Sequence, residues 1–589
     1  MLIRLLILLP VSKHDMVYKA QTSILFFVER NLHLPFLEPV HDYFKQHHPE
    51  IITGFSAPPF RQSIKGKPGR GVDGETKKRL SQKSVFIENP AQFNPDVCLI
   101  ADINAVYYLR GCEKIVNVGH SLNSKGRHYT NRPIVLRENL ADLVCVPGPF
   151  HYDVLKKNLV VPVVTTGYIK SDVLFRSSGA FREKLCQFYN IDPAHKLVLF
   201  APTFDPQLSA IPVVRERIVE VAGSGIHLVI KLHGMTDHEW VSTYKSLAEK
   251  NACCTFVSDN DISPWLQAAD LLISDVSSAF LEFMLLNKPV ILVDNPLKEH
   301  FAHYDSSDIE YSAREACETV KSCVELKQAV HEALNHSDKK IEQRKKITDM
   351  LCYGRDGKSA ERTAKAVLRH LHQKFPLKLS VIVPWGNPPC SSELLCFLSH
   401  LKQSTRKFDI EIIMCGSSQK LEAPEIQALK WIECREPNAE TLHQAVCAAD
   451  NEFVAVLFPE VRLPDSWPKF LMSHIHRHKE TGLVQAIQCD QDYERIVSTY
   501  FSEYKNAPLS EISYLFNLFL IGSGLKTEHI SSPCIMFTKE KYHKNCPSQP
   551  GNHQTIYEFL SLLGKTMRLR SLAIIKALDV FAYTVAGKQ

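Results

Sequence analysis

The turn Ile273-Ser-Asp-Val-Ser-Ser278 carries the strongest chemical signal in this sequence. A buried strand is expected to end at Asp275, and Ser277 and Ser278 then open a helix. Such a turn directs backbone N–H groups, hydroxyls and the positive end of a helix dipole at one point, which favours a bound diphosphate. Asp275 could cap the helix or orient the hydroxyls, and an ordinary N-cap would account for the same residues. Glu282 lies one helical turn beyond Ser278, where it could hold a ribose.

Two histidines end apolar runs, His120 in KIVNVGH and His233 in IHLVIKLH. Each stands just past a predicted strand, one on either side of an expected cleft. Imidazole titrates near neutral pH, so this placement suits a general base facing an electrophilic or phosphate-binding partner. A histidine is more often a structural hydrogen bonder, and the chain has 26 of them. Lys231 shares a strand face with His233 if that strand continues, and Thr203 could add a hydroxyl to the phosphate site.

The elements that must position these residues alternate between short apolar runs and longer amphipathic ones. This alternation predicts an α/β fold with two successive Rossmann-like lobes, each a parallel sheet covered on both faces, and a ligand cleft where the strands end. We assign residues 1–175 to the first lobe and residues 176–375 to the second. The predicted strands are SILFFVE, VCLIAD, KIVNVGH, LVCVPG and VPVVTTG, then KLVLFAPT, IHLVIKLHG, CTFVSD, ADLLISD and KPVILVD.

Six motifs occur in the order and spacing of a known family. They are Gly119-His120, GYIKSDVL (167–174), LFAPTFD (199–205), VIKLHG (229–234), ISDVSSAFLEF (273–283) and DGKSAERTAKAVL (356–368). Over about residues 20–372 the chain resembles the CDP-glycerol glycerophosphotransferases of bacterial teichoic-acid and capsule synthesis. The resemblance implies a GT-B fold whose second lobe binds the donor. It also implies transfer of a polyol phosphate from a CDP-polyol to a hydroxyl of a cell-envelope glycan or lipid-linked polymer, with release of CMP.

The resemblance also implies roles for the residues above. His120 would deprotonate the acceptor hydroxyl, and His233 would stabilise charge on the transferring phosphate or the leaving group. The residues expected around the CDP moiety and its phosphates are Thr203, Lys231, Asp275, Ser277, Ser278 and Glu282. Relatives often have aspartate at the position of Glu282, which weakens any inference about donor identity. The resemblance also implies no obligatory metal or other cofactor, since GT-B enzymes usually act without one.

Composition and charge favour a cytoplasmic protein, peripheral at most on the inner face of the membrane. The net charge of +5 does not indicate a nucleic-acid partner, and 17 cysteines without a C-x-x-C pattern indicate reduced thiols. The apolar run in MLIRLLILLPVSK is too short to span a bilayer. The segment 61–83 carries eight Lys and Arg against Asp73 and Glu75. We predict a solvated loop there, with contact to an anionic membrane or polyanionic acceptor as the alternative.

Residues 377–589 are predicted to form a separate α/β domain, which resembles family 2 glycosyltransferases of the GT-A type as far as about residue 500. Cys415-Gly416 replaces the aspartate expected at the nucleotide, and Phe458-Pro-Glu460 replaces the metal-binding D-x-D. A divalent cation on a diphosphate needs two or more oxygen ligands, so Glu460 alone is a poor set. Asp490-Gln-Asp492 offers a substitute pair, although a surface turn is the simpler interpretation. We therefore predict a catalytically degenerate domain used for binding or assembly.

Two other functions fit parts of the sequence. The first is another GT-B activity, a nucleotide-sugar glycosyltransferase or a UDP-sugar 2-epimerase-like enzyme, which would use a UDP ligand. The second is a non-catalytic scaffold for envelope assembly. The sequence alone decides neither the polyol nor the acceptor, and it gives no oligomeric state.

Overall fold

The structure is a computed structural model of the 589-residue chain. It describes residues 21–584 except 63–68, 111, 124–128, 130–132, 177–179, 224, 260, 337–338, 387–390, 418–428, 478, 489–490, 505–506 and 547–553. The chain divides into two compact units. Unit 1 comprises residues 1–135, 143–155 and 163–369, and unit 2 comprises 136–142, 156–162 and 370–589.

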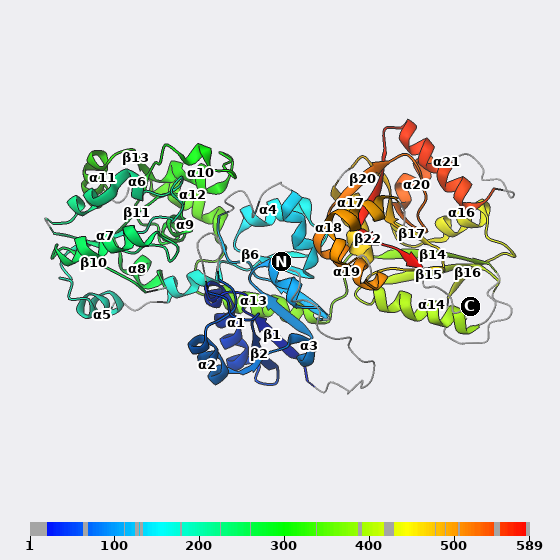
Figure 1. Cartoon of the computed structure of the whole chain (residues 1–589), viewed down its shortest axis with the longest axis horizontal. Helices are drawn as coiled ribbons and strands as arrows, with labels where there is room; N and C mark the ends of the chain where they lie inside the picture. Colours follow the sequence, from blue (N-terminus) through cyan, green and yellow to red (C-terminus); the bar gives the residue numbers. More distant parts are fainter. Residues whose placement is uncertain are drawn as a thin grey trace. The chain divides into compact units, whose positions relative to one another are not determined.

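The first lobe of unit 1 is a seven-stranded parallel sheet, as the alternation predicts (Figure 1). Its strand order is β3-β2-β1-β4-β5-β6-β7. The strands are β1 (Ser23–Phe27), β2 (Ile52–Ser56), β3 (Val85–Ile87), β4 (Val97–Ile100), β5 (Lys114–Asn117), β6 (Leu143–Val146) and β7 (Val163–Thr165). The connecting helices are α1 (Leu34–His47), α2 (Gly74–Lys83), α3 (Pro90–Phe93) and α4 (Pro149–Asn158), with 3-10 turns η1 (Asn31–His33), η2 (Ile103–Tyr108), η3 (Pro133–Leu140) and η4 (Ile169–Phe175).

The second lobe is a six-stranded parallel sheet in the order β10-β9-β8-β11-β12-β13. The strands are β8 (Lys196–Phe200), β9 (Ile226–Ile230), β10 (Cys254–Phe256), β11 (Leu271–Ser274), β12 (Val290–Val293) and β13 (Glu318–Val320). Its α-helices are α5 (Ala180–Phe188), α6 (Ile211–Val214), α7 (His238–Glu249), α8 (Ser263–Ala268), α9 (Ser278–Met284), α10 (Ile309–Ser312), α11 (Cys323–Asn335), α12 (Ile341–Leu351) and α13 (Ser359–Leu371). Short 3-10 turns are η5 (Arg215–Val221), η6 (Lys298–His300) and η7 (Ala313–Ala316).

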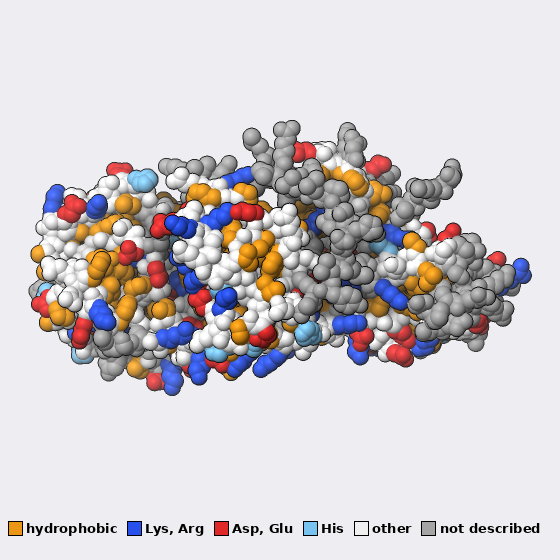
Figure 2. Space-filling view, turned by 90° about the horizontal axis from the view of Figure 1, so that it is seen from below, with side chains coloured by type: hydrophobic (Ala, Val, Ile, Leu, Met, Phe, Trp, Pro, Cys, Tyr) orange, Lys and Arg blue, Asp and Glu red, His pale blue; other side chains and the backbone are white. Residues whose placement is uncertain are grey.

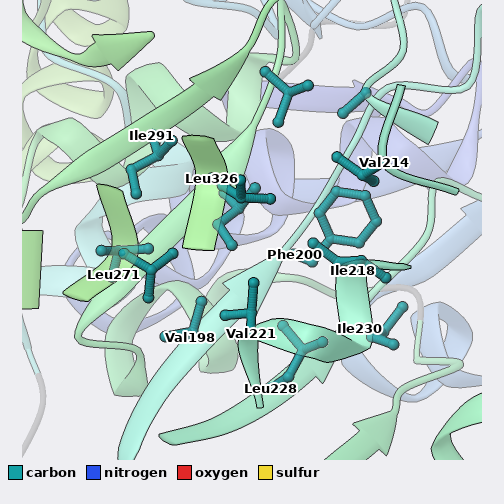
Figure 3. Close-up of a cluster of buried hydrophobic side chains, with 14 of the residues drawn as sticks. Val198, Phe200, Val214, Ile218, Val221, Leu228, Ile230, Leu271, Ile291 and Leu326 are labelled. Carbon is teal, nitrogen blue, oxygen red and sulfur yellow. The ribbon is translucent and has the colours of Figure 1, made fainter. Parts of the chain in front are cut away.

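The core of the second lobe explains why its strands read as continuous apolar runs. Every residue of IHLVI in β9 is buried, because helices cover both faces of a parallel sheet. Figure 3 shows Phe200 of β8 near Val214 and Ile218, on one side of that sheet. This packing holds the carboxyl ends of β8, β9 and β11 in fixed register.

Two of the six motifs bind each other within unit 1. Asp172 of GYIKSDVL accepts hydrogen bonds from the backbone N–H groups of Ser359 (2.9 Å) and Ala360 (2.8 Å), which open α13. Arg362 in the same helix donates to the carbonyl of Thr166 at 2.8 Å. Gly167 has φ +96°, and a Cβ there would lie 2.4 Å from the Ser359 hydroxyl. These contacts fix the start of α13 against the segment that follows β7 of the first lobe.

The loop predicted for residues 61–83 is wrong over its second half. Residues 74–83 form α2, because the side chain of Asp73 caps the helix by accepting from the N–H of Thr76 at 2.8 Å. Cations of α2 also pair with acids of the first lobe, Arg79 with Glu38 and Lys83 with both Glu38 and Asp42. A charge run can thus be one face of a helix held by ion pairs. Residues 63–68 of the segment lie outside the described residues.

Unit 2 is a second α/β body built on an eight-stranded mixed sheet, in the order β16-β15-β14-β17-β21-β19-β22-β20. The strands are β14 (Leu379–Gly386), β15 (Ile410–Gly416), β16 (Lys430–Glu433), β17 (Phe453–Leu457), β19 (Thr481–Ile487), β20 (Gly524–Thr527), β21 (Cys534–Thr538) and β22 (Ala573–Phe581), and β18 (Val461–Arg462) pairs with β23 (Tyr583–Thr584). Its α-helices are α14 (Ser391–Ser404), α16 (Ala439–Ala448), α17 (Trp467–Arg477), α18 (Gln491–Tyr500), α19 (Leu509–Phe519), α20 (Lys539–Asn545) and α21 (Ile556–Leu569), with the 3-10 turn η8 (Ser502–Tyr504). The residues beyond 500, which the sequence analysis did not assign, supply three strands of this sheet. In the described part of the chain, no helix is long and apolar enough to cross a membrane.

Candidate functional site

A cavity of about 840 Å³ in unit 1 collects residues from the carboxyl ends of both parallel sheets. The first lobe contributes His120, Ser121, Tyr168 and Lys170, among others. Seven of the eight residues singled out from the sequence line this cavity, namely His120, Thr203, Lys231, His233, Ser277, Ser278 and Glu282. The eighth, Asp275, lies behind the cavity wall. The two lobes thus bring the predicted residues to one place, as expected for a ligand bound where parallel strands end.

His120 lies in the turn after β5, and its hydrogen bond indicates which ring nitrogen carries the proton. Gly119 makes this turn with φ +65°, a conformation that glycine adopts readily. The Nδ1 atom of His120 lies 2.7 Å from the carbonyl oxygen of Ala101. Because a carbonyl only accepts, Nδ1 carries the hydrogen and the lone pair is on Nε2. An imidazole in this tautomer can take a proton at Nε2, which is what a general base requires.

His233 follows β9 and has the opposite arrangement. The backbone N–H of Met235 donates to Nδ1 of His233 at 3.1 Å. In the neutral ring, Nδ1 therefore holds the lone pair, and the hydrogen is on Nε2. The ring also packs on Phe204, with 4.8 Å between the ring centroids. An imidazole so arranged can donate a hydrogen bond to a negatively charged oxygen in the cavity.

Lys231 brings a buried cation to the same wall. Its side chain is almost fully buried, and burial lowers its pKa from the usual lysine value. The carboxylates of Asp261 and Asp259 act in the opposite direction, and the charge of Lys170 lowers the pKa further. A cation with so little water around it interacts strongly with an anion that enters the cavity.

Asp275 organises the turn that the sequence analysis placed around the donor. Its carboxylate accepts from the backbone N–H groups of Thr203 (3.0 Å), Ala210 (2.8 Å) and Ser277 (3.0 Å). The side chain is 1% exposed and does not line the cavity, so direct contact with CDP does not fit its position. Ser277 is the N-cap, and its hydroxyl accepts from the N–H of Ala279 at 3.3 Å. Asp275 thus fixes the loops that carry Thr203 and Ser277.

Glu282 connects the two lobes at the cavity wall. It is 3% exposed and accepts from the Tyr168 hydroxyl at 3.0 Å and from Lys170 Nζ at 2.8 Å. Burial raises the pKa of Tyr168 well above its usual value, and the charge of Glu282 adds to this effect. The sequence analysis missed Tyr168 and Lys170 as cavity residues, although both lie in the motif GYIKSDVL. The motif marks both residues in the sequence, but it does not indicate that they bond to Glu282 on α9.

Two polar side chains lie behind His120 in the first lobe. The ring of His33 is fully buried, and its centroid lies 5.0 Å from that of His120. Burial lowers the pKa of His33 well below its usual value, and the nearby His120 acts in the same direction while Asp102 opposes it. Asp102 is 7% exposed and follows β4. Among the described residues, the group with metal-ligand spacing consists of His33, Asp102 and His120.

The corresponding edge of unit 2 has a different character. Cys415 is buried in the core, and the ring of Phe458 stacks on Tyr557 at 4.5 Å between centroids with 10° between planes. The pKa of Tyr557 is raised to about 12, mainly by burial and also by the charge of Glu460. The described residues at this edge offer no counterpart of the convergent histidines of unit 1. Asp490 is outside the described residues, and so are the side chains of 491 and 492.

A large part of unit 1 is similar to known proteins. Residues 109–369 match the family described as CDP-Glycerol:Poly(glycerophosphate) glycerophosphotransferase. The teichoic acid glycerol-phosphate primase of Bacillus subtilis (strain 168) is 32% identical over 120 residues, which are 20% of this chain and 30% of that protein. The teichoic acid ribitol-phosphate polymerase TarK of Staphylococcus aureus (strain NCTC 8325 / PS 47) is 28% identical over 217 residues, 35% of this chain and 40% of that protein. The chain therefore spans less than half the length of these curated relatives.

Two solved structures illustrate the alignments found. The wall teichoic acid polymerase TagF aligns with a TM-score of 0.46 and 13% identity, over 59% of this chain and 88% of that chain. The complex of S. aureus MnaA with UDP aligns with a TM-score of 0.41 and 16% identity, over 60% of this chain and 97% of that chain.

Proposed function

We propose that unit 1 is a polyol-phosphate transferase, a function supported by the match of residues 109–369 to the CDP-Glycerol:Poly(glycerophosphate) glycerophosphotransferase family. It moves glycerol phosphate or a similar polyol phosphate from a CDP-polyol to a hydroxyl of a cell-wall polymer and releases CMP. One observation carries the proposal. His120 and His233 line the same cavity, and their hydrogen bonds give them opposite arrangements of proton and lone pair.

The reaction assigns one task to each histidine. The acceptor oxygen attacks the phosphorus that carries the polyol, and Nε2 of His120 takes the proton of the acceptor hydroxyl. The bond from that phosphorus to the bridging oxygen breaks, and its electron pair stays with the phosphate of CMP. Negative charge grows on the phosphate oxygens during this step. The Nε2–H group of His233 can donate to one of them, and such preorganised donors are a main source of phosphoryl-transfer catalysis.

The diphosphate of the donor is held by charge and hydroxyl groups. Lys231 supplies a buried cation, and Thr203, Ser277 and Ser278 bring hydroxyl side chains to the cavity wall. The helix that Ser278 opens, α9, has seven residues. A dipole this short contributes less than the sequence analysis assumed, because the macrodipole is a sum over aligned peptide units. We therefore assign most of the phosphate binding to the lysine and the hydroxyls.

A direct assay tests this function. The purified chain is incubated with CDP-glycerol, CDP-ribitol or a UDP-sugar, together with short glycerol phosphate and ribitol phosphate oligomers as acceptors. We expect CMP release that depends on the acceptor, and acceptors that grow by polyol phosphate units in mass spectrometry. Release of UDP from a UDP-sugar, with no CMP from either CDP-polyol, would overturn the proposal.

Matched variants separate chemistry from folding in the same assay. His120→Gln should lower acceptor-dependent CMP release by at least about 100-fold while the protein still binds CDP in a thermal-shift measurement. His227 serves as the control, because it lies on β9, outside the cavity lining, and bonds to the hydroxyl of Thr255 at 2.8 Å. His227→Gln should leave the activity close to that of the wild type.

We also propose that the protein binds peripherally to an anionic membrane. Figure 2 shows Lys and Arg side chains interspersed with Asp and Glu on one face of the molecule. The pairing of Arg79 and Lys83 with acids reduces the charge that α2 offers to a lipid surface. We expect weak binding to phosphatidylglycerol vesicles at low salt and its loss at about 0.15 M salt, where the Debye length is about 8 Å. Vesicle binding that is unchanged by salt would contradict an electrostatic attachment.

A further inference from the structure

A compact group of metal-ligand side chains lies at the carboxyl edge of the first lobe. One ring nitrogen each from His33 and His120 and one carboxylate oxygen of Asp102 all lie within 4.8 Å of one another. The three residues come from the segments after β1, β5 and β4, which are neighbours in the sheet. His33 and His120 are 87 positions apart in the sequence, and the fold brings them together.

His33 is the member of this group with unused hydrogen-bonding capacity. Its side chain has no exposed surface, and neither ring nitrogen has a hydrogen-bond partner within the described part of the chain. A buried polar group without a partner is unfavourable, and buried imidazoles are therefore normally bonded. A neutral imidazole has one nitrogen lone pair that a cation can share.

The hydrogen bonds around the other two residues match those of metal ligands. Nδ1–H of His120 donates to the carbonyl of Ala101 at 2.7 Å, which leaves Nε2 as the coordinating nitrogen. The carboxylate of Asp102 accepts from the backbone N–H and the side-chain amide of Asn104, at 2.9 and 2.8 Å. Metal-bound histidines usually donate their second ring N–H to a carbonyl or carboxylate, and metal-bound carboxylates are also hydrogen-bonded.

We propose that His33, Asp102 and His120 form a binding site for a divalent transition-metal ion of the zinc type. Two neutral imidazoles and one carboxylate suit Zn²⁺ or Co²⁺, whereas Mg²⁺ and Ca²⁺ prefer an all-oxygen set. Protein ligands would fill three positions at a bonding distance of about 2.0–2.2 Å, which requires the donor atoms to lie closer together than the 4.8 Å limit that now encloses them. His120 lines the cavity, so the ion can enter from there.

The site also has a consequence for the transferase, which rests on the proposed function. The proton acceptor of the reaction and the metal ligand are the same atom, Nε2 of His120. An imidazole that binds a metal through this lone pair cannot accept a proton there. Zinc occupancy should therefore inhibit transfer reversibly, and a chelator should restore it.

Metal binding is tested without any activity measurement. The full chain, untagged and freed of metal with EDTA, is titrated with Zn²⁺ by calorimetry and with Co²⁺ by visible absorption. We expect one tight site per chain, no comparable binding of Mg²⁺, and affinity at least about 100-fold weaker in His33→Leu and in Asp102→Asn. Asp102→Asn keeps the shape of the side chain, so it gives an answer even if His33→Leu fails to fold.

Zinc can also bind weakly elsewhere on a chain with 26 histidines and 17 cysteines, so a control variant in unit 2 is needed. His474 is buried and bonds to Asp579 at 2.9 Å, so His474→Gln removes a histidine–carboxylate pair that lacks a second histidine in the described structure. This variant should keep the tight site. Equal Zn²⁺ affinity in the wild type, His33→Leu and Asp102→Asn would overturn the proposal, and so would the absence of a tight site in the folded wild type.

Activity measurements distinguish a failure of the metal-site proposal from a failure of the proposed transferase function. If the site binds zinc as described but no CDP-polyol yields CMP, the proposed function fails and the metal site stands. If CMP is released and added zinc leaves the rate unchanged while filling the site, the inhibitory role fails.

Discussion

His120 and His233 are the same residue type, each just past the carboxyl end of a parallel strand, and the backbone around them makes them chemically different. Each follows a parallel strand, and both line the same cavity. A carbonyl accepts from Nδ1 of His120, whereas an N–H group donates to Nδ1 of His233. The first ring can therefore take a proton at Nε2, and the second can give a hydrogen bond from Nε2. Catalytic roles here follow from the neighbouring backbone group more than from residue identity.

The largest effect is expected at the base. Replacement of His120 by glutamine removes the proton acceptor, because an amide cannot take a proton near neutral pH. We expect kcat to fall by about 10²–10⁴-fold with little change in the binding of CDP. Steady-state CMP release and calorimetry with CDP measure the two quantities. A kcat within tenfold of the wild type would remove His120 from its assigned role.

A smaller and different effect is expected at His233. His233→Ala removes the donor and should lower kcat by about 10²–10³-fold. His233→Gln keeps an N–H donor on a side chain of similar reach, so we expect it to recover part of this loss. The comparison of the two glutamine variants is the informative one. Rescue by glutamine at position 120 and none at 233 would reverse the assignment.

The pH dependence of donor binding should reflect the buried cation beside His233. Burial lowers the pKa of Lys231, so this lysine loses its charge at a lower pH than an exposed lysine does. The KM for the CDP-polyol should therefore begin to rise on the alkaline side at a pH below the usual lysine pKa of 10.5. Lys231→Arg keeps its charge over this range and should move the rise to higher pH. A KM profile identical in both proteins would exclude Lys231 from phosphate binding.

The smallest effect concerns the contact that holds the two lobes together at the cavity wall. Tyr168→Phe removes one hydrogen bond to the buried carboxylate of Glu282 and should cost about 1 kcal/mol of unfolding free energy. Lys170→Met removes the ion pair and should cost more, about 3 kcal/mol, because it leaves a buried charge without its cation. Urea unfolding followed by fluorescence and circular dichroism measures both. A more stable Lys170→Met protein would show that the ion pair is not needed for folding.

Particular residues show which features of the site could be predicted from the sequence. Periodicity predicted the strands that carry His120 and His233, because apolar runs in a parallel sheet are buried on both faces. It could not show that Asp275 turns inward to three backbone N–H groups, since an N-cap and a ligand contact use the same residue types. It also missed Lys170, whose partner Glu282 is 112 residues away. Contacts at such separation depend on how the lobes pack, which local patterns do not encode.

The domain past residue 377 shows the same limit in another form. Strands of five or more apolar residues, such as β17, were recognisable from the sequence. The strand β20 (GLKT) was not, because three of its four residues are glycine or polar, and it is the edge strand next to β22. The GT-A resemblance of this unit remains a prediction.

The most direct test of the account is the protonation of the two imidazoles. Long-range ¹H–¹⁵N spectra of protein labelled only at histidine separate protonated from unprotonated ring nitrogens, and the signals lost in His120→Gln and His233→Gln assign them. The account predicts that Nε2 is unprotonated in His120 and protonated in His233 at a pH where both rings are neutral. The same tautomer at both positions would contradict it.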